Sequence, residues 1–168
     1  MNVTQTTGGP AWGTLFTLDN YTLDNLSATG GPLNITREVM IQDGSGTWTV
    51  IKKGQTIKVG DRIRVRLDLK SDRELSYIEV RDNLGTGLMP VRVLSGYQYR
   101  QGLSYYQSRE PESVVYNLTE LPKGISTIEY QAIVEQAGSY FGGYATATSL
   151  YAPEFRAWSN SARIRAKR

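Results

Sequence analysis

Residues 61–82, DRIRVRLDLKSDRELSYIEVRD, decide the fold of this chain. In the first half of this stretch, apolar and charged residues alternate, with Ile63, Val65, Leu67 and Leu69 set between Arg64, Arg66, Asp68 and Lys70. A period of two places one set of side chains in a core and the other set in water. The stretch therefore predicts a half-buried antiparallel strand.

The same alternation recurs further along the chain. It is clear in residues 127–136, TIEYQAIVEQ, and in residues 162–167, ARIRAK, whose inward sets are Ile128, Tyr130, Ala132, Val134 and Ala162, Ile164, Ala166. Shorter runs typical of strands lie at residues 36–43, 47–51, 77–80, 89–94, 114–118 and 144–150. No segment holds a helical stripe of apolar residues over three turns.

Turn sequences separate these runs. DGSG at 43–46, KG at 53–54, VGD at 59–61, PKG at 122–124 and AG at 137–138 each supply residues that favour a chain reversal. Many short strands with turns between them, and no helix for parallel crossovers, predict an all-β antiparallel sandwich. Residues 95–113 are the exception, and we expect an ordered surface excursion or an extra hairpin there.

The composition argues against an enzyme. The 168 residues contain no Cys and no His, which removes thiolate and imidazole as nucleophiles, bases and metal ligands. The chain has no phosphate-binding glycine loop and no nucleophile elbow, and its carboxylates are scattered. We expect no catalytic residue, cofactor or metal. The net charge is +3, but the basic residues are spread over alternating positions, so we expect no nucleic-acid partner.

Tyrosine is the unusual residue, with 11 copies. Tyr97, Tyr99, Tyr105 and Tyr106 fall within residues 95–113, which we interpret as a loop. Exposed tyrosines suit protein recognition, whereas buried ones fill the cores of sandwiches. The pattern leaves both a protein-contact surface and local packing open, with sugar binding as a third use.

Several motifs, taken in order, carry a family resemblance. They are GPAWG at 9–13, VGDRIRVRL at 59–67, DRELSYIEVRD at 72–82, VLSGYQYRQGLSYYQS at 93–108, LPKG at 121–124 and LYAPEF at 150–155. From about residue 8 to its end, the chain resembles the C-terminal end of bacterial alpha-2-macroglobulin-family proteins, especially large envelope proteins of the Bacteroidetes kind. Many members have a Pro-Ala-Gly-Phe turn where this chain has DNLGTGLMPV at 82–91, so a role tied to that turn is in doubt here.

The resemblance implies two parts. Residues 1–33 would hold the last strand of a preceding CUB-like module, at 8–18, plus a linker. Residues 34–168 would form the C-terminal macroglobulin-like sandwich, of the receptor-binding-domain type. The Thr-, Asn- and Gly-rich composition of the first part also leaves a partly disordered tail open.

The resemblance also implies an interdomain contact. We expect a strand to end at Leu150, because Pro153 lacks an N–H donor, and pairing to resume from Ala162. The intervening turn would expose Tyr151, Glu154, Phe155 and Arg156. In thioester-bearing relatives the terminal domain covers the thioester with aromatic side chains, which would be Tyr151 and Phe155 here. The alternative is that both rings plug the end of the sandwich.

The function implied is that of a non-catalytic terminal domain in a broad-spectrum protease inhibitor of the bacterial cell envelope, periplasmic or anchored to the outer membrane through its parent. Its partners would be neighbouring domains and, through the full-length protein, host or foreign proteases. The thioester motif Cys-Gly-Glu-Gln is not in this sequence. The alternative is an autonomous adhesion or carbohydrate-binding module that uses the tyrosines of residues 95–113.

Overall fold

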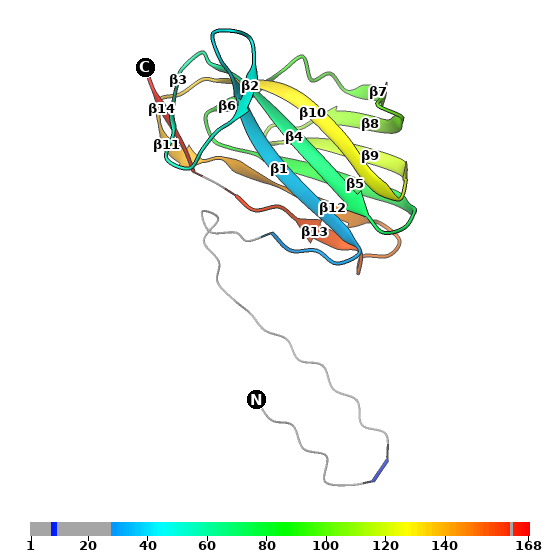
Figure 1. Cartoon of the computed structure of the whole chain (residues 1–168). Helices are drawn as coiled ribbons and strands as arrows, with labels where there is room; N and C mark the ends of the chain where they lie inside the picture. Colours follow the sequence, from blue (N-terminus) through cyan, green and yellow to red (C-terminus); the bar gives the residue numbers. More distant parts are fainter. Residues whose placement is uncertain (1–7, 10–27, 162) are drawn as a thin grey trace.

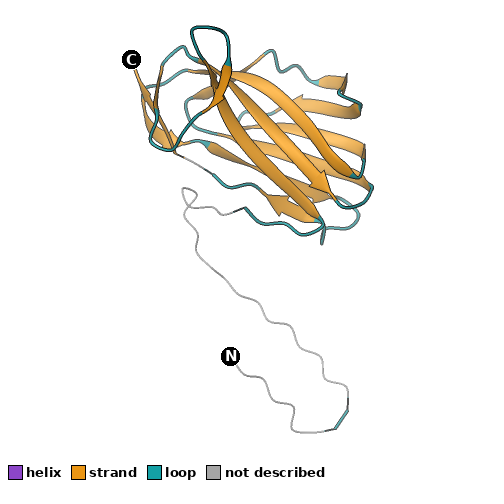
Figure 2. Ribbon diagram, viewed as in Figure 1, coloured by secondary structure: helices purple, strands orange, loops and turns teal. Residues whose placement is uncertain are grey.

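The computed structural model describes residues 8–9, 28–161 and 163–168. Within them every regular element is a β-strand (Figure 2). The all-β prediction is confirmed. In the same residues, no helix is long and apolar enough to cross a membrane.

Two main sheets stack face to face (Figure 1). The first has the order β2 (Trp48–Val50), β1 (Leu33–Gln42), β4 (Arg62–Ser71), β10 (Gly124–Val134) and β6 (Leu88–Val91). The second has the order β13 (Arg156–Trp158), β12 (Gly143–Ser149), β5 (Leu75–Leu84), β9 (Ser113–Leu121), β8 (Leu103–Arg109) and β7 (Gly96–Arg100). Every pair of neighbours in these two sheets is antiparallel.

A small third sheet has the order β11 (Gly138–Phe141), β14 (Arg163–Lys167) and β3 (Thr56–Lys58). Strand β14 pairs antiparallel with β11 but parallel with β3, so this pair departs from the antiparallel pattern that we expected.

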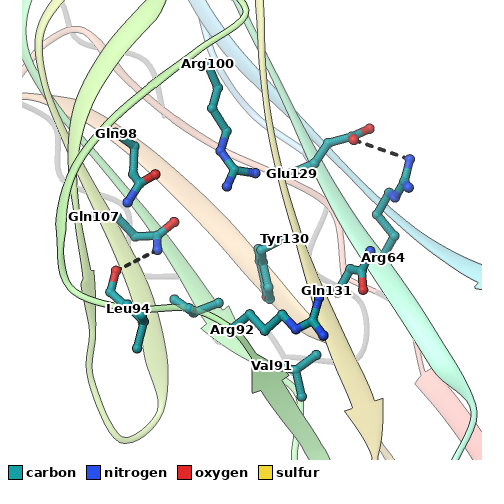
Figure 3. Close-up of a pocket in the computed structure, with 11 residues that line it drawn as sticks. Arg64, Val91, Arg92, Leu94, Gln98, Arg100, Gln107, Glu129, Tyr130 and Gln131 are labelled. Atoms are coloured by element: carbon teal, nitrogen blue, oxygen red, sulfur yellow. Dashed lines mark hydrogen bonds and ion pairs between the residues drawn. The ribbon is translucent and has the colours of Figure 1, made fainter.

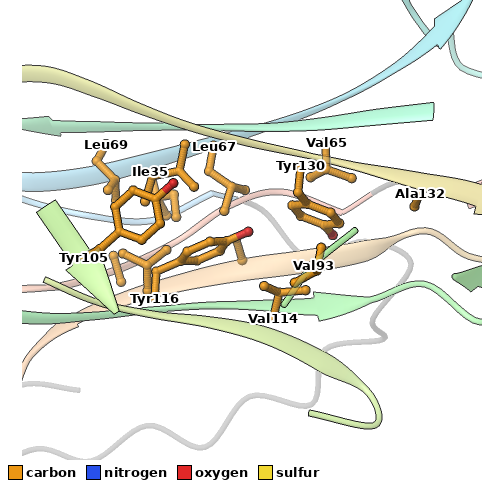
Figure 4. Packing of buried hydrophobic residues seen from close by; sticks show 14 of the residues in the cluster. Ile35, Val65, Leu67, Leu69, Val93, Tyr105, Val114, Tyr116, Tyr130 and Ala132 are labelled. Atoms are coloured by element: carbon orange, nitrogen blue, oxygen red, sulfur yellow. The ribbon is translucent and has the colours of Figure 1, made fainter. Parts of the chain in front are cut away.

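The core lies between the two main sheets. The inward sets that alternation predicted on β4 and β10 are buried, and so are Ile164 and Ala166 on β14. Figure 4 shows Leu67, Leu69 and Ile35 of one sheet facing Tyr105 and Tyr116 of the other. Complete burial of such side chains contributes about 1.5–3 kcal/mol each, so this layer dominates the stability of the fold.

Within residues 95–113 the chain forms an extra hairpin, which is the second of the two alternatives that we expected for this segment. Strands β7 and β8 pair through the register Gly96↔Gln107 to Arg100↔Leu103, and β8 continues the second sheet beyond β9. Our placement of the four tyrosines in a loop was therefore wrong, since each belongs to one of these two strands. The alternation is blurred here because glutamine, serine and tyrosine do not separate into apolar and charged sets.

The chain reverses after β12 as Pro153 indicated, but it pairs again sooner than expected. The backbone N–H of Phe155 donates to the carbonyl of Ala152 at 2.8 Å, which places Pro153 at the second position of a β-turn. Strand β13 then returns along β12 from Arg156, not from Ala162. Ala162 itself lies outside the described residues.

The sandwich also takes in residues before the boundary at 33/34. Strand β1 begins at Leu33, and Thr29 exchanges two backbone hydrogen bonds with Trp158, at 3.0 and 2.9 Å. The strand that we expected at 8–18 lies outside the described residues, apart from Gly8 and Gly9.

Candidate functional site

An exposed apolar cluster, here called the aromatic tip, lies at the end of the sandwich away from the C-terminus (Figure 1). It consists of Tyr77, Leu150, Tyr151 and Phe155. The rings of Tyr77 and Tyr151 meet edge to face with centroids 4.9 Å apart, and the N–H of Leu150 donates to the Tyr77 carbonyl at 2.9 Å. Tyr151 is 79% exposed, whereas Phe155 is half-buried against the core. Thus Phe155 helps to close the sandwich and Tyr151 projects from it.

Tyr77 has a strained backbone. Its φ is +53°, a left-handed conformation that bulky residues rarely adopt. The register of β5 against β9 keeps the same offset from Ser76↔Glu120 to Ile78↔Leu118, and Tyr77, between these two pairs, has no partner in this ladder. Ser76 and Tyr77 are both exposed between the buried Leu75 and Ile78, so the inward–outward alternation of β5 is interrupted here. Such a conformation costs on the order of 1–3 kcal/mol and occurs most often at functional sites.

Charged groups border the aromatic tip. The guanidinium carbon of Arg73 lies 5.6 Å from the centre of the Phe155 ring, and Arg73 pairs with Asp72 at 2.8 Å. The hydrogen bond between the two side chains lowers the pKa of Asp72 and raises the pKa of Arg73. Glu154 and Arg156 are exposed and form no ion pair within the described residues. The four residues predicted for interdomain contact therefore lie on one turn and its following strand.

The four tyrosines of the β7–β8 hairpin separate into two groups. Tyr97, Tyr99 and Tyr106 are exposed, and the rings of Tyr97 and Tyr106 meet edge to face at 5.0 Å. Tyr105 points into the core and packs edge to face on Tyr116 at 5.5 Å, and burial raises the pKa of Tyr105. Local packing is thus the role that fits Tyr105, and the other three form an exposed tyrosine surface.

A buried polar cluster was missed by sequence reasoning. Arg37 Nε lies 2.6 Å from Asp82 Oδ1, and the hydroxyl of Tyr130 donates to Asp82 Oδ2. Burial opposes the charge of Arg37, but attraction to Asp82 and Tyr130 leaves its pKa raised; burial and then Asp82 raise the pKa of Tyr130 well above its usual value. The signal was present in the alternation, because Asp82 follows Ile78 and Val80 on the inward face.

The described residues contain no group of three or more His, Cys, Asp or Glu side chains placed to hold a metal ion. Their charged side chains form scattered pairs, such as Arg81 with Glu110 at 2.5 Å and Arg66 with Asp68 at 3.0 Å.

Comparison with known proteins agrees with the family resemblance. The family model "Bacterial Alpha-2-macroglobulin MG10 domain" matches residues 33–154, most of the chain. This chain belongs to that family.

Solved structures of bacterial alpha-2-macroglobulins share the fold of this MG10 domain. Salmonella alpha-2-macroglobulin reacted with methylamine superposes with a TM-score of 0.68 at 18% identity, covering 88% of this chain and 10% of that one. Trypsin-activated alpha-2-macroglobulin from Escherichia coli gives 0.67 at 15% identity, covering 85% and 11%. A native Escherichia coli fragment from domain MG7 to the C-terminus gives 0.66 at 19%, covering 86% and 25%.

The chain therefore spans about a tenth of the first of these proteins. No curated protein sequence matches it significantly. The macroglobulin-type sandwich predicted from the resemblance is confirmed. A Bacteroidetes origin and a C-terminal position in the parent remain predictions.

Proposed function

We propose that this MG10 domain is a non-catalytic packing module of an alpha-2-macroglobulin-like, broad-spectrum protease inhibitor. Its aromatic tip contacts a neighbouring module of the parent and, where the parent carries a thioester, keeps water from it. The parent acts at the bacterial cell envelope, in the periplasm or anchored to the outer membrane. The observation that carries this proposal is the exposed Tyr77–Tyr151 pair on a strained backbone.

The structure of the tip supports a contact role over simple plugging. An isolated sandwich gains nothing from holding Tyr77 in a left-handed conformation that presents its ring to water. A partner that covers Tyr77, Leu150 and Tyr151 would repay this strain, because aromatic side chains contribute much of the energy of protein contacts. Phe155 supports the turn from below, with Arg73 against its ring.

The solved relatives support a protease-related role for the parent. Escherichia coli proteins with the same fold were solved after activation by trypsin and by porcine elastase, and the Salmonella protein after reaction with methylamine. This domain has neither a metal cluster in its described residues nor a nucleophile motif in its sequence. Its contribution to a trap is therefore mechanical.

The test compares two tyrosine variants in the full-length parent. Tyr151→Ala removes the projecting ring of the tip, and Tyr99→Ala removes an equally exposed ring from the β7–β8 hairpin as the matched control. Trapping is measured as the fraction of trypsin held by the parent, and thioester lifetime as the rate of reaction with methylamine. We expect Tyr151→Ala to reduce trapping and shorten the lifetime, and Tyr99→Ala to leave both unchanged.

Unchanged trapping and lifetime in Tyr151→Ala would overturn the proposal.

The exposed tyrosine surface of Tyr97, Tyr99 and Tyr106 favours a second candidate, an adhesion or carbohydrate-binding module. That candidate would be supported instead if Tyr99→Ala lost glycan or cell-surface binding while Tyr151→Ala left trapping, thioester lifetime and this binding unchanged.

A further inference from the structure

A basic groove runs along one open side of the sandwich, between β10 of the first sheet and β7 of the second (Figure 3). Its volume is about 470 Å³, within the usual range of ligand sites. The ring of Tyr130 lies among its lining residues. The side-chain amide of Gln107 donates to the carbonyl of Leu94 at 2.9 Å, which fixes the wall formed by the β6–β7 connection.

The lining of the groove carries an excess of positive charge. Arg64, Arg92 and Arg100 contribute three guanidinium groups, and Glu129 is the carboxylate among the lining residues. Arg64 is paired with Glu129 at 3.4 Å. Arg92 and Arg100 are exposed and have no ion-pair partner within the described residues. Two planar guanidinium groups are thus available to a carboxylate-bearing ligand.

The groove adjoins a free edge of strand β10, and the last two residues of this edge, Glu129 and Tyr130, are among the lining residues of the groove. Strand β6 pairs with β10 through Gln131–Val134 only, whereas β4 pairs with the other side of β10 from Gly124 to Ile133. In the described residues, the β6-side edge of β10 from 124 to 130 therefore has no strand partner. Ile125, on this edge, is 70% exposed. An unpaired edge beside an exposed apolar residue is a template for an added strand.

The backbone at Arg92 directs the chain away from this edge. Arg92 has a φ of +56°, and the chain crosses there from β6 in the first sheet toward β7 in the second. An extended Arg92 would let β6 continue along β10 and fill the edge. The left-handed residue instead leaves the edge open, and Arg92 lines the groove together with Glu129 and Tyr130, the end of that edge.

We propose that this groove binds an extended acidic peptide segment, which adds as a strand to the free edge of β10 and places its carboxylates on Arg92 and Arg100. The seven residues of free edge correspond to roughly 23 Å of extended chain. Backbone hydrogen bonds to β10 supply affinity, and the two arginines select acidic side chains. This site is separate from the aromatic tip and does not depend on the proposed function.

The test uses the full chain and a fluorescein-labelled seven-residue peptide of alternating valine and glutamate. The comparison peptides replace glutamate with lysine, or carry N-methyl groups on alternate backbone amides. Fluorescence anisotropy measures binding, and amide hydrogen exchange of residues 124–130 reports strand pairing. We expect the acidic peptide to bind and to slow this exchange, and both comparison peptides to bind at least about tenfold more weakly, a difference of 1.4 kcal/mol.

Charge reversal tests the two arginines. Arg92→Glu with Arg100→Glu should weaken binding at least about tenfold, as expected for the loss of two charge-assisted contacts. Arg156→Glu with Arg165→Glu, exposed on β13 and β14, changes the net charge equally and should leave binding within about twofold. Arg100→Glu alone keeps the backbone at Arg92 untouched and should show part of the loss.

Four results would overturn the proposal. In the first two, the acidic peptide binds no more tightly than the lysine peptide, or it binds the variant with Arg92→Glu and Arg100→Glu as tightly as the native chain. In the third, free glutamate displaces the labelled peptide as effectively as the unlabelled acidic peptide does, which would indicate a simple anion site. In the fourth, oligothymidylate does so, which would indicate a nucleic-acid groove. Because the N-methylated peptide is tested against the native chain, its result does not depend on whether a variant folds, and it tests strand addition directly.

Discussion

At the scale of single residues, the ion pair of Arg37 and Asp82 joins the two main sheets through the core. Arg37 comes from β1 of the first sheet and Asp82 from β5 of the second. Gly143 makes room for it, since a Cβ there would lie 2.8 Å from Arg37 Nη2 and 2.4 Å from the Asn83 carbonyl. A buried pair adds little net stability, but losing one partner is costly because the other charge is left buried.

Two buried tyrosines provide a matched test of this cluster. Tyr130→Phe removes the hydroxyl that donates to Asp82 and should cost about 1–3 kcal/mol of unfolding free energy. Tyr116→Phe removes a buried hydroxyl with no partner among the described residues, so it should be neutral or stabilising. Urea denaturation of both variants measures the difference, and equal losses would show that the bond to Asp82 contributes nothing.

Single residues also mark the limit of sequence reasoning. The alternation of Ile78 and Val80 could have placed Asp82 on an inward face, but nothing local identifies Arg37 as its partner, because the two are 45 positions apart. The left-handed backbone of Tyr77 had no glycine or asparagine to signal it. The motif LYAPEF did locate the turn that carries Tyr151, although its contact with Tyr77 depends on pairing between β12 and β5.

At the scale of elements, prediction succeeded where strands are long and charged on one side. Ten and eleven residues of alternation made β4 and β10 clear. Strands β3 and β13 have three residues each, which is too short for a period of two to be distinguished from chance. The parallel pairing of β14 with β3 could not be predicted, because a local pattern identifies a strand but not its neighbour.

The β1–β2 hairpin depends on one exposed carboxylate. Asp43 accepts hydrogen bonds from Ser45 Oγ at 2.6 Å, from Ser45 N at 2.9 Å and from Thr47 N at 2.8 Å. The Ser45 hydroxyl, followed by the Thr47 amide, lowers the pKa of Asp43. A lowered carboxyl pKa stabilises the fold above the unfolded-state value of about 3.9, and this contribution is lost as the pH falls through the folded pKa.

Asp43→Ala should therefore loosen β2 at neutral pH. We expect amide exchange at Trp48–Val50 to become several-fold faster, because β2 is a three-residue edge strand held by this turn. The difference between variant and native protection should shrink as the pH falls below about 3.9 and through the lowered folded-state pKa of Asp43. Asp72→Ala serves as the control, since the pKa of Asp72 is also lowered but its partner Arg73 lies in the β4–β5 turn. Equal protection of β2 at all pH values would contradict the prediction.

At the scale of the whole molecule, the C-terminal strand closes the fold. Strand β14 is the central strand of the small sheet and holds β3 and β11 together, although these are about 80 residues apart. The N–H of Val59 donates to the Lys167 carbonyl at 2.9 Å, and the N–H of Gly60 donates to the Val134 carbonyl at 2.8 Å. The small sheet is thereby fastened to the end of β10. The family match ends at residue 154, yet β13 and β14 complete the same core.

Two neighbours on β14 test whether the small sheet unfolds together with the main core. Ile164 is buried in the shared core cluster, whereas Arg165 is exposed on the opposite face of the strand. Ile164→Ala should cost about 2–5 kcal/mol and lower the melting temperature by roughly 5–15 °C in a single calorimetric transition. Arg165→Ala should stay within about 0.5 kcal/mol of the native chain. A separate low-temperature transition in Ile164→Ala, with the main transition unmoved, would mean that the C-terminal strand is an appendage and does not close the sandwich.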